Sequence, residues 1–179
     1  MTEVKLMKEP RLWTPDGFVD DDAWTIVSDE EIVVDGNSKQ VLPLARYLDM
    51  DDSLRTRAVG VLLGPSDDVM DLEPFLERLD LIAVTFPAFN DGRAFSQASL
   101  LRSRLGYAGD IRATGDVLID QIPLMLRCGV TSFKVSNTTA LKRLAEGRLP
   151  GIDAYYQPAA VPTKSAGKYS WRRTPGAAA

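Results

Sequence analysis

Two short polar stretches of the sequence hold the residue types that could bind an anion and move a proton. One stretch places Asp91 and Arg93 on either side of a glycine. The other places Arg112, Thr114 and Asp116 close together. Guanidinium groups bind oxyanions through paired hydrogen bonds, and a desolvated carboxylate can act as a general acid or base. These stretches therefore predict a polar site for an anionic small molecule.

Within this site, Asp116 and Asp91 are the candidates for acid–base catalysis. The residues expected to bind the substrate are Arg93, Arg112, Thr114, Ser96 and Gln121. Asp91 has an alternative role as the N-cap of the helix that follows it. Arg112 has the alternative of an internal ion pair with Asp91 or Asp116, because an arginine in a buried strand needs a partner. The sequence leaves both alternatives open.

The residues that the chain lacks exclude several kinds of chemistry. It has no histidine and one cysteine, Cys128, so nucleophile systems that need histidine cannot form within it. One thiol cannot make an internal disulfide, a four-cysteine zinc site or an iron–sulfur cluster. Neither a GxGxxG dinucleotide fingerprint after a strand nor a phosphate-binding P-loop motif is present. The cofactor is therefore unknown, no metal site is expected, and the sequence leaves open whether the protein is an enzyme.

The elements that must position these residues follow a regular alternation. Apolar strand patterns at residues 58–63, 81–86, 109–114 and 132–137 alternate with amphipathic helical patterns. This alternation is typical of a parallel sheet covered by helices, and four units are too few for a closed eight-stranded barrel. We expect an α/β fold with a small parallel sheet of about four βα units, open or half-barrel-like. The sequence leaves open whether the short N-terminal strands extend this sheet. The carboxyl ends of parallel strands share one edge, so the two polar stretches should meet there.

The chain length of 179 residues fits one domain. We expect a single α/β domain over residues 1–158, in which residues 1–54 form an irregular part with short strands. The acidic run at residues 20–22 is expected to be solvated. Residues 159–179 lack periodicity and are rich in Pro, Gly, Ala and Ser, which predicts a flexible tail.

The net charge and the hydropathy of the chain indicate which partners and which cellular compartment to expect. The net charge of −4 argues against a general nucleic-acid or anionic-membrane binder, although a local basic patch stays open. No apolar run is long enough for a signal peptide or a membrane span, and the single cysteine suits a reducing compartment. We therefore expect a cytoplasmic protein without a nucleic-acid or membrane partner, and leave a homodimer open.

Residues 89–133 resemble the core of an uncharacterised bacterial domain-of-unknown-function family, DUF 934. The resemblance extends over most of residues 27–157 and is densest at DGR (residues 91–93), LLRSRLGY (residues 100–107) and RATGDVLIDQ (residues 112–121). Members of the family are described as oxidoreductases involved in sulfite reduction, because they occur beside assimilatory sulfite reductase. The resemblance therefore implies a role in sulfur assimilation, with sulfite reductase as a partner. It supplies no catalytic residues.

Three functions follow from these observations. The first is an accessory protein or oxidoreductase of assimilatory sulfite reduction, with an anion-binding site at the C-terminal edge of the sheet. The second is a small-molecule enzyme that binds an anionic substrate through arginines and uses a carboxylate for acid–base work. The third is a non-catalytic module that docks on sulfite reductase. The chain cannot be the sirohaem protein itself, because it lacks the cysteines of the iron–sulfur cluster.

Overall fold

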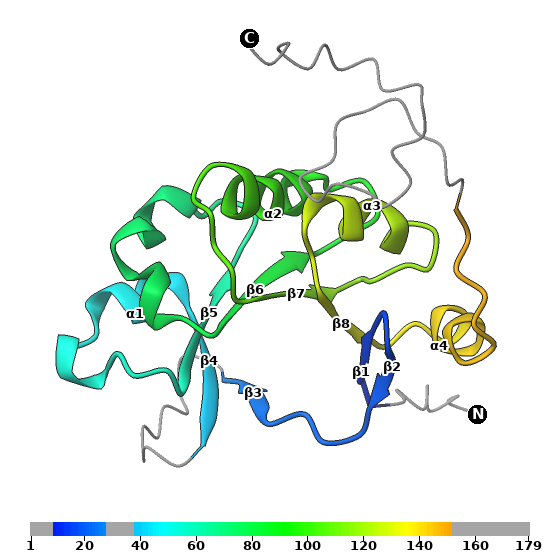
Figure 1. Ribbon diagram of the computed structural model, residues 1–179, viewed down its shortest axis with the longest axis horizontal. Coiled ribbons are helices and arrows are strands. Elements are labelled where there is room, and N and C mark those ends of the chain that lie inside the picture. Colours follow the sequence, from blue (N-terminus) through cyan, green and yellow to red (C-terminus); the bar gives the residue numbers. More distant parts are fainter. Residues whose placement is uncertain (1–8, 28–37, 152–179) are drawn as a thin grey trace, which may run out of the picture.

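The computed structural model describes residues 9–27 and 38–151, which form a curved sheet with helices packed on one side (Figure 1). The sheet has eight strands, here in chain order: β1 (Arg11–Thr14), β2 (Gly17–Val19), β3 (Trp24–Ile26), β4 (Lys39–Pro43), β5 (Val59–Leu63), β6 (Leu81–Phe86), β7 (Asp110–Gly115) and β8 (Ser132–Val135). The helices are α1 (Leu44–Asp49), η1 (Asp52–Leu54), η2 (Val69–Arg78), α2 (Arg93–Ser103), α3 (Ile122–Cys128) and α4 (Thr138–Ala145), of which η1 and η2 are 3₁₀ helices.

Strands β3 to β8 lie side by side in chain order and are parallel. The β1–β2 hairpin extends this sheet, because β1 pairs antiparallel with β8. The expected mixed α/β, half-barrel-like fold is therefore confirmed. The expectation of a small, wholly parallel sheet of about four strands is wrong, because the N-terminal part adds four strands to the same sheet. Two of these have only 3 residues and a third has 4, which is too short to show a periodicity.

One face of the sheet is apolar and covered by helices. Strands that follow one another in chain order, joined by right-handed crossovers, place their helices on the same face. Alternate residues of β6 (Ile82, Val84 and Phe86) and of β7 (Ile111 and Ala113) point into this layer and belong to the main hydrophobic core. Figure 1 shows α2 and α3 above β6 and β7, and α1 at the left beside β5.

The opposite face changes character across the sheet. Around β4 and β6, Val41, Leu81 and Ala83 form a second small apolar cluster. At β7 and β8 the residues of this face are polar, and Arg112 and Ser132 are buried there. Since side chains alternate between the two faces of a strand, the same strands supply both a hydrophobic core and a buried polar cluster.

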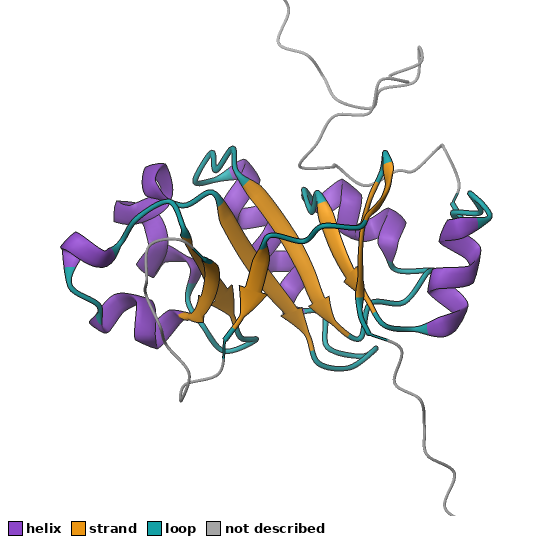
Figure 2. Cartoon of the chain, turned by 90° about the horizontal axis from the view of Figure 1, so that it is seen from below, coloured by secondary structure: helices purple, strands orange, loops and turns teal. Residues whose placement is uncertain are grey.

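Residues 20–23, which we call the strap, run across this second face. They connect β2 with β3, at opposite edges of the sheet. Five residue steps, from Val19 to Trp24, span at most about 17 Å, whereas a flat sheet of eight strands would be about 34 Å wide. The sheet must therefore curl, with the strap on its concave face, as Figure 2 shows from the strap side.

The strand boundaries expected from the sequence agree with the structure to within two residues, and one expected helix differs in type. The helix expected after β5 is the 3₁₀ helix η2, which contains Pro74. Gly129 follows α3 with a positive φ of 101°, as expected for a helix-ending glycine. The expected domain boundary at residue 158 and the expected flexible tail lie outside the described residues. Within residues 9–27 and 38–151, no helix has the length and apolar character needed to cross a bilayer.

Candidate functional site

Arg112 is the centre of a charged cluster on the concave face. Its side chain lies on β7 and is buried, with 6% of its surface exposed. Its Nη1 donates to Asp22 Oδ1 at 2.8 Å, its Nη2 to Asp110 Oδ2 at 3.3 Å, and its Nε to Ser132 Oγ at 3.1 Å. The guanidinium group therefore connects the strap with both β7 and β8.

Asp22 bridges two cations from neighbouring strands. Its Oδ2 accepts from Lys134 Nζ at 2.6 Å, while its Oδ1 accepts from Arg112 and from the Trp24 backbone N–H at 3.2 Å. Burial alone would raise the pKa of Asp22. The hydrogen bond from Lys134, the charge of Arg112 and the Trp24 N–H outweigh this effect, so the pKa is lowered. The carboxylate form of Asp22 is thereby favoured.

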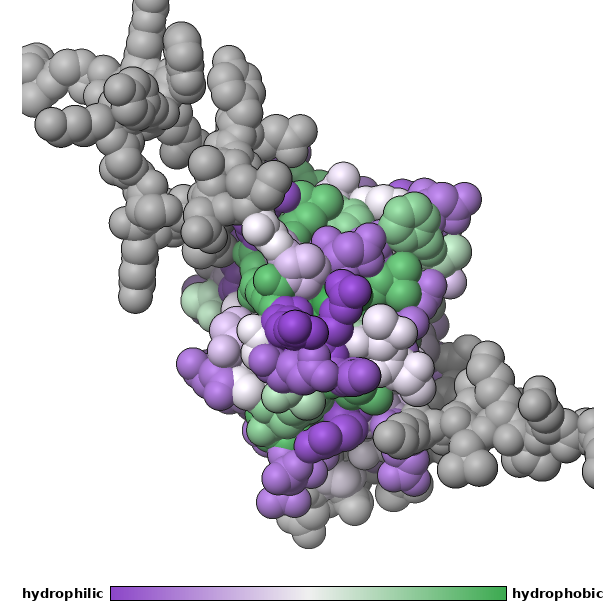
Figure 3. All heavy atoms as spheres, turned by 90° about the vertical axis from the view of Figure 1, so that its right-hand side faces the viewer, coloured by the Kyte–Doolittle hydropathy of each residue, from purple (hydrophilic) through white to green (hydrophobic). Residues whose placement is uncertain are grey.

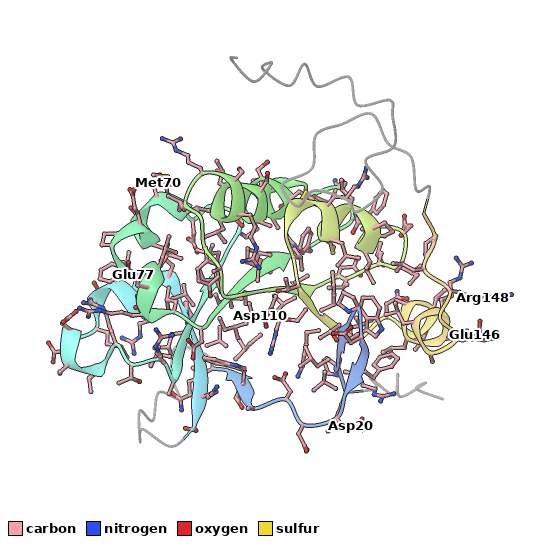
Figure 4. The ribbon with its side chains drawn as sticks, viewed as in Figure 1. Asp20, Met70, Glu77, Asp110, Glu146 and Arg148 are labelled. Atoms are coloured by element: carbon pink, nitrogen blue, oxygen red, sulfur yellow. The ribbon has the colours of Figure 1, made fainter. Side chains whose placement is uncertain are left out.

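Asp110 begins β7 and is held by two hydroxyl groups. Thr131 Oγ1 donates to Asp110 Oδ1 at 2.6 Å, and Ser132 Oγ donates to Asp110 Oδ2 at 2.7 Å. The strand register explains this arrangement, because Arg112 and Ser132 are partners in the β7–β8 pair. Figure 4 labels Asp110 in the middle of the molecule, between the helical layer and the strap side.

A cavity of about 530 Å³ opens beside this cluster. Its charged lining consists of Arg112, Lys134 and Asp22, while Trp24 supplies an apolar wall. Gly115 and Ser136, from the C-terminal ends of β7 and β8, place it toward the C-terminal edge of the sheet. The lining thus holds two cations and one carboxylate, and a second carboxylate, Asp110, pairs with Arg112 from outside the lining.

Asp91 and Arg93 form a separate ion pair at the start of α2. Arg93 donates through Nε to Asp91 Oδ1 at 3.0 Å and through Nη2 to Asp91 Oδ2 at 2.7 Å. This fork, together with the Arg93 backbone N–H, lowers the pKa of Asp91. The Arg93 side chain is 57% exposed, and its Nη1 also reaches Ser66 Oγ at 3.4 Å. The pair therefore lies at the surface, outside the concave cluster.

The structure thus divides the predicted site into two groups. Arg112 and Thr114 share the concave cavity, as their spacing on one strand face predicted. Arg112 does form an internal ion pair, but the expected partners, Asp91 and Asp116, are wrong, because its partners are Asp22 and Asp110. The alternation of side chains turns Arg112 to the concave face, away from the loop that begins α2 and holds Asp91. Strand β7 ends at Gly115, whose positive φ of 86° takes the chain out of the strand before Asp116.

Two of the other predicted residues, Asp116 and Gln121, hold the loops of the C-terminal edge. The backbone N–H of Asp116 donates to the Phe86 carbonyl at 2.7 Å. Gln121 Nε2 donates to the Phe89 carbonyl at 3.1 Å and so connects the loops that follow β6 and β7. Ser96 is exposed on α2. These contacts are structural, and none of them places the three side chains beside Arg112.

Sequence reasoning missed several members of the cluster. Ser132 and Lys134 occupy alternate positions of β8, so strand parity could have placed them beside Arg112. Asp110 lies two residues before Arg112 on the same strand, so strand parity could also have placed it on the same face. Asp22 carries no such signal, because it belongs to the acidic run that was expected to be solvated. Only the tertiary path of the strap brings it inward.

Cys128 shows no sign of a reactive role. It is half-buried at the end of α3 and packs against the hydrophobic core. Burial raises the pKa of its thiol, against a smaller opposing effect from Arg127. A raised pKa reduces the thiolate form that reacts, so the structure supports a packing role for Cys128.

A basic patch lies on α4 and the residues after it. We define it by Lys142, Arg143 and Arg148, which line a hollow of about 450 Å³ together with Glu146. Arg148 pairs with Glu146 at 3.3 Å, whereas Lys142 and Arg143 have no ion-pair partner among the described residues. Figure 4 labels Glu146 and Arg148 beside α4, and Figure 3 shows that hydrophilic residues cover much of that side of the molecule. The patch is a local exception to the net negative charge.

Fold and site together define a mixed α/β half-barrel protein with a charged cluster on its concave face. The chain belongs to the bacterial family of unknown function DUF934, whose family model matches residues 60–166. This match confirms the family that residues 89–133 indicated. No curated protein matches the chain.

Proposed function

We propose that the protein is a cytoplasmic accessory protein of assimilatory sulfite reduction, and that it binds a small anion on the concave face of its half-barrel. One observation carries the anion site: Arg112 and Lys134 lie within ion-pair distance of a single carboxylate in a cavity. The connection with sulfite reduction rests on the resemblance of residues 89–133 to a family described in those terms.

The chemistry of the cavity suits an oxyanion. Charged N–H donors make short, strong hydrogen bonds to anionic oxygens, and partial burial strengthens the attraction. Arg112 and Lys134 supply these donors from adjacent strands, which fixes their separation. The site is therefore built for binding and needs no rearrangement of the sheet.

An accessory role fits the arrangement better than an enzymatic one. The carboxylates proposed for acid–base work, Asp91 and Asp116, lie outside the cavity lining. Asp110 contacts Arg112, but its oxygens are already occupied by the hydroxyl groups of Thr131 and Ser132. The cavity thus offers cations for binding and no evident free base.

Growth on different sulfur sources tests the biological role. Deleting the gene should prevent or slow growth on sulfate or sulfite and leave growth on cysteine unchanged. Complementation by the wild-type gene should restore growth. Normal growth of the deletion strain on sulfate, without a second copy of the gene, would argue strongly against the proposal.

Calorimetric titration of the purified chain with sulfite tests the anion site. Lys134→Gln removes one of the two cations and should weaken binding about tenfold or more, since a lost charged hydrogen bond costs roughly 1.5–3 kcal/mol. Lys142→Gln removes the same charge from the surface of α4 and should leave affinity unchanged. Equal affinity of wild type and Lys134→Gln would place the anion elsewhere.

The basic patch favours a second candidate function, docking on an acidic surface of sulfite reductase. Lys142 and Arg143 are exposed and have no ion-pair partner among the described residues, so their charges are available to a partner. Complementary charge raises association rates and selects partners. This function is compatible with anion binding, because the patch lies on α4 and the cavity on the concave face.

Co-purification with the reductase tests docking. Reversal of both charges, Lys142→Glu with Arg143→Glu, should abolish co-purification at low salt. Arg104→Glu, an exposed residue at the end of α2, is the control and should retain the partner. Retention of the reductase by the doubly reversed variant would remove the basic patch from consideration.

A further inference from the structure

We infer that the Asp22 carboxylate occupies the position of the ligand's own anionic group, so that the strap is a tethered competitor for the site. This inference rests on the proposed anion binding and deepens it. It names the ligand class as small oxyanions that can offer two oxygens to two cations. It also implies that such a ligand enters by displacing the strap.

The contacts of Asp22 are those expected of a bound oxyanion. Each carboxylate oxygen meets a different cation, Oδ1 with Arg112 at 2.8 Å and Oδ2 with Lys134 at 2.6 Å. The two cations come from neighbouring parallel strands, and Asp22 comes from a segment distant in sequence. A free carboxylate, sulfite or sulfate can make the same pair of contacts.

The strap is held to the sheet mainly through this one side chain. Asp21 and Ala23 are exposed, and Asp20 pairs with Arg11 at 3.3 Å on the surface. Trp24 begins β3, so the backbone hydrogen bonds of the sheet resume directly after the strap. Releasing Asp22 therefore disturbs few other contacts.

The cavity gives the displacing ligand a place to bind. It lies beside Asp22 and has a volume of about 530 Å³, well above that of a small oxyanion. When Asp22 leaves, Arg112 keeps Asp110 as a partner at 3.3 Å, whereas Lys134 has no other ion-pair partner among the described residues. The two cations then face one carboxylate, which leaves one positive charge without a counter-ion. An oxyanion restores the charge balance that the strap gave up.

The test compares three full-length proteins: wild type, Asp22→Asn and Asp21→Asn. Each is titrated calorimetrically with sulfite, sulfate and acetate, against sodium chloride of equal ionic strength. Asp22→Asn should bind at least one of the oxyanions about tenfold or more tightly than wild type, a difference of about 1.4 kcal/mol. Asp21→Asn removes the same charge from the same strap and should behave as wild type does.

Two further measurements separate displacement from a merely structural role. Adding Lys134→Gln to Asp22→Asn should remove the gain in affinity, because the second cation is lost. In the wild type, the oxyanion should increase amide hydrogen exchange in residues 20–24, because the strap leaves the concave face and the Trp24 N–H loses its acceptor on Asp22. If Asp22→Asn lowers the thermal midpoint, sulfite should restore it more than chloride does.

The outcomes distinguish this inference from the proposed function. Equal sulfite affinity in wild type and Asp22→Asn overturns the inference and leaves anion binding intact. Slower amide exchange of the strap on sulfite binding overturns it as well. Binding by Asp22→Asn with none in the wild type supports it. No oxyanion binding by any of the proteins overturns both the inference and the anion site, while the growth test decides the role in sulfite reduction separately.

Discussion

At the scale of single residues, Arg112 joins segments that are far apart in the sequence. It bonds Asp22 of the strap, Asp110 of its own strand and Ser132 of β8. A buried cation of this kind is costly to desolvate, and its loss leaves buried carboxylates without a counter-charge. We therefore expect Arg112 to contribute both to the stability of the concave face and to the binding of a ligand there.

Replacing Arg112 with methionine should lower the free energy of unfolding by about 3 kcal/mol or more, because Asp22 and Asp110 lose their shared cation. Urea unfolding followed by circular dichroism measures this change. Arg104→Met, at an exposed position after α2, is the matched control and should change stability by less than about 0.5 kcal/mol. A similarly small effect for Arg112→Met would show that the ion pairs contribute little.

Asp22 should make stability depend on pH in acid. Its pKa in the folded protein lies below its ordinary value of 3.8, so the native state favours the carboxylate. The resulting stabilisation is complete above the unfolded pKa and is lost as the pH falls through the folded pKa. The difference in unfolding free energy between wild type and Asp22→Asn should therefore shrink as the pH falls from about 5 toward 2. A difference that stays constant over this range would contradict the lowered pKa.

At the scale of elements, the end of β7 depends on a glycine. Gly115 has a φ of 86°, in the left-handed region that favours glycine. A Cβ at this position would collide with the backbone carbonyl of Phe86 on β6. This close approach lets the next N–H, that of Asp116, donate to the same carbonyl at 2.7 Å.

Gly115→Ala should therefore lower the free energy of unfolding by about 1–3 kcal/mol, as a strained backbone position and a backbone clash coincide. Gly147→Ala is the control, because Gly147 also has a positive φ, of 66°, but has open space around it. Chemical unfolding measures the loss of unfolding free energy in each variant. Gly147→Ala reports the backbone strain alone, and Gly115→Ala reports the strain together with the clash. Equal losses would show that the contact with Phe86 relaxes freely.

The sequence predicted the elements of the regular part well and those of the irregular part poorly. The apolar run at residues 81–86 coincides with β6 because both of its faces are buried. In contrast, β1 and β2 were missed, since short hairpin strands gain their order from pairing with β8 rather than from local pattern. The residues of the site also differ in how far the sequence predicts them. Strand parity placed Thr114 and Arg112 together, whereas the position of Asp22 depends on a contact between residues 90 positions apart in the sequence.

At the scale of the whole molecule, the N-terminal part completes the sheet on both sides. Strand β1 pairs with β8, and the Trp13 ring packs against Phe133, tilted by 52° with ring centroids 5.5 Å apart. Strand β4 covers β5, and Tyr47 of α1 is fully buried in the core. The family match at residues 60–166 includes neither β1 nor β4 and α1.

A fragment of residues 60–166 should therefore fail to fold as a stable monomer. It would expose β5 and β8 as sheet edges and leave the partners of Trp13 and Tyr47 uncovered, which favours aggregation. Size-exclusion chromatography and thermal unfolding of the fragment, beside the full chain, measure this outcome. A monomeric fragment with a cooperative transition would show that the N-terminal part serves the site rather than the fold.

The two edges of the sheet in the described part of the chain are β2 and β3, each 3 residues long. Edges this short offer few free backbone groups to an incoming strand, which limits strand addition as a mode of association. Such edges are consistent with the proposed recognition through side chains on α4 and on the concave face. The affinity of the protein for a molecule recognised in this way should then fall as the ionic strength rises, because salt screens the charged groups that hold the complex together.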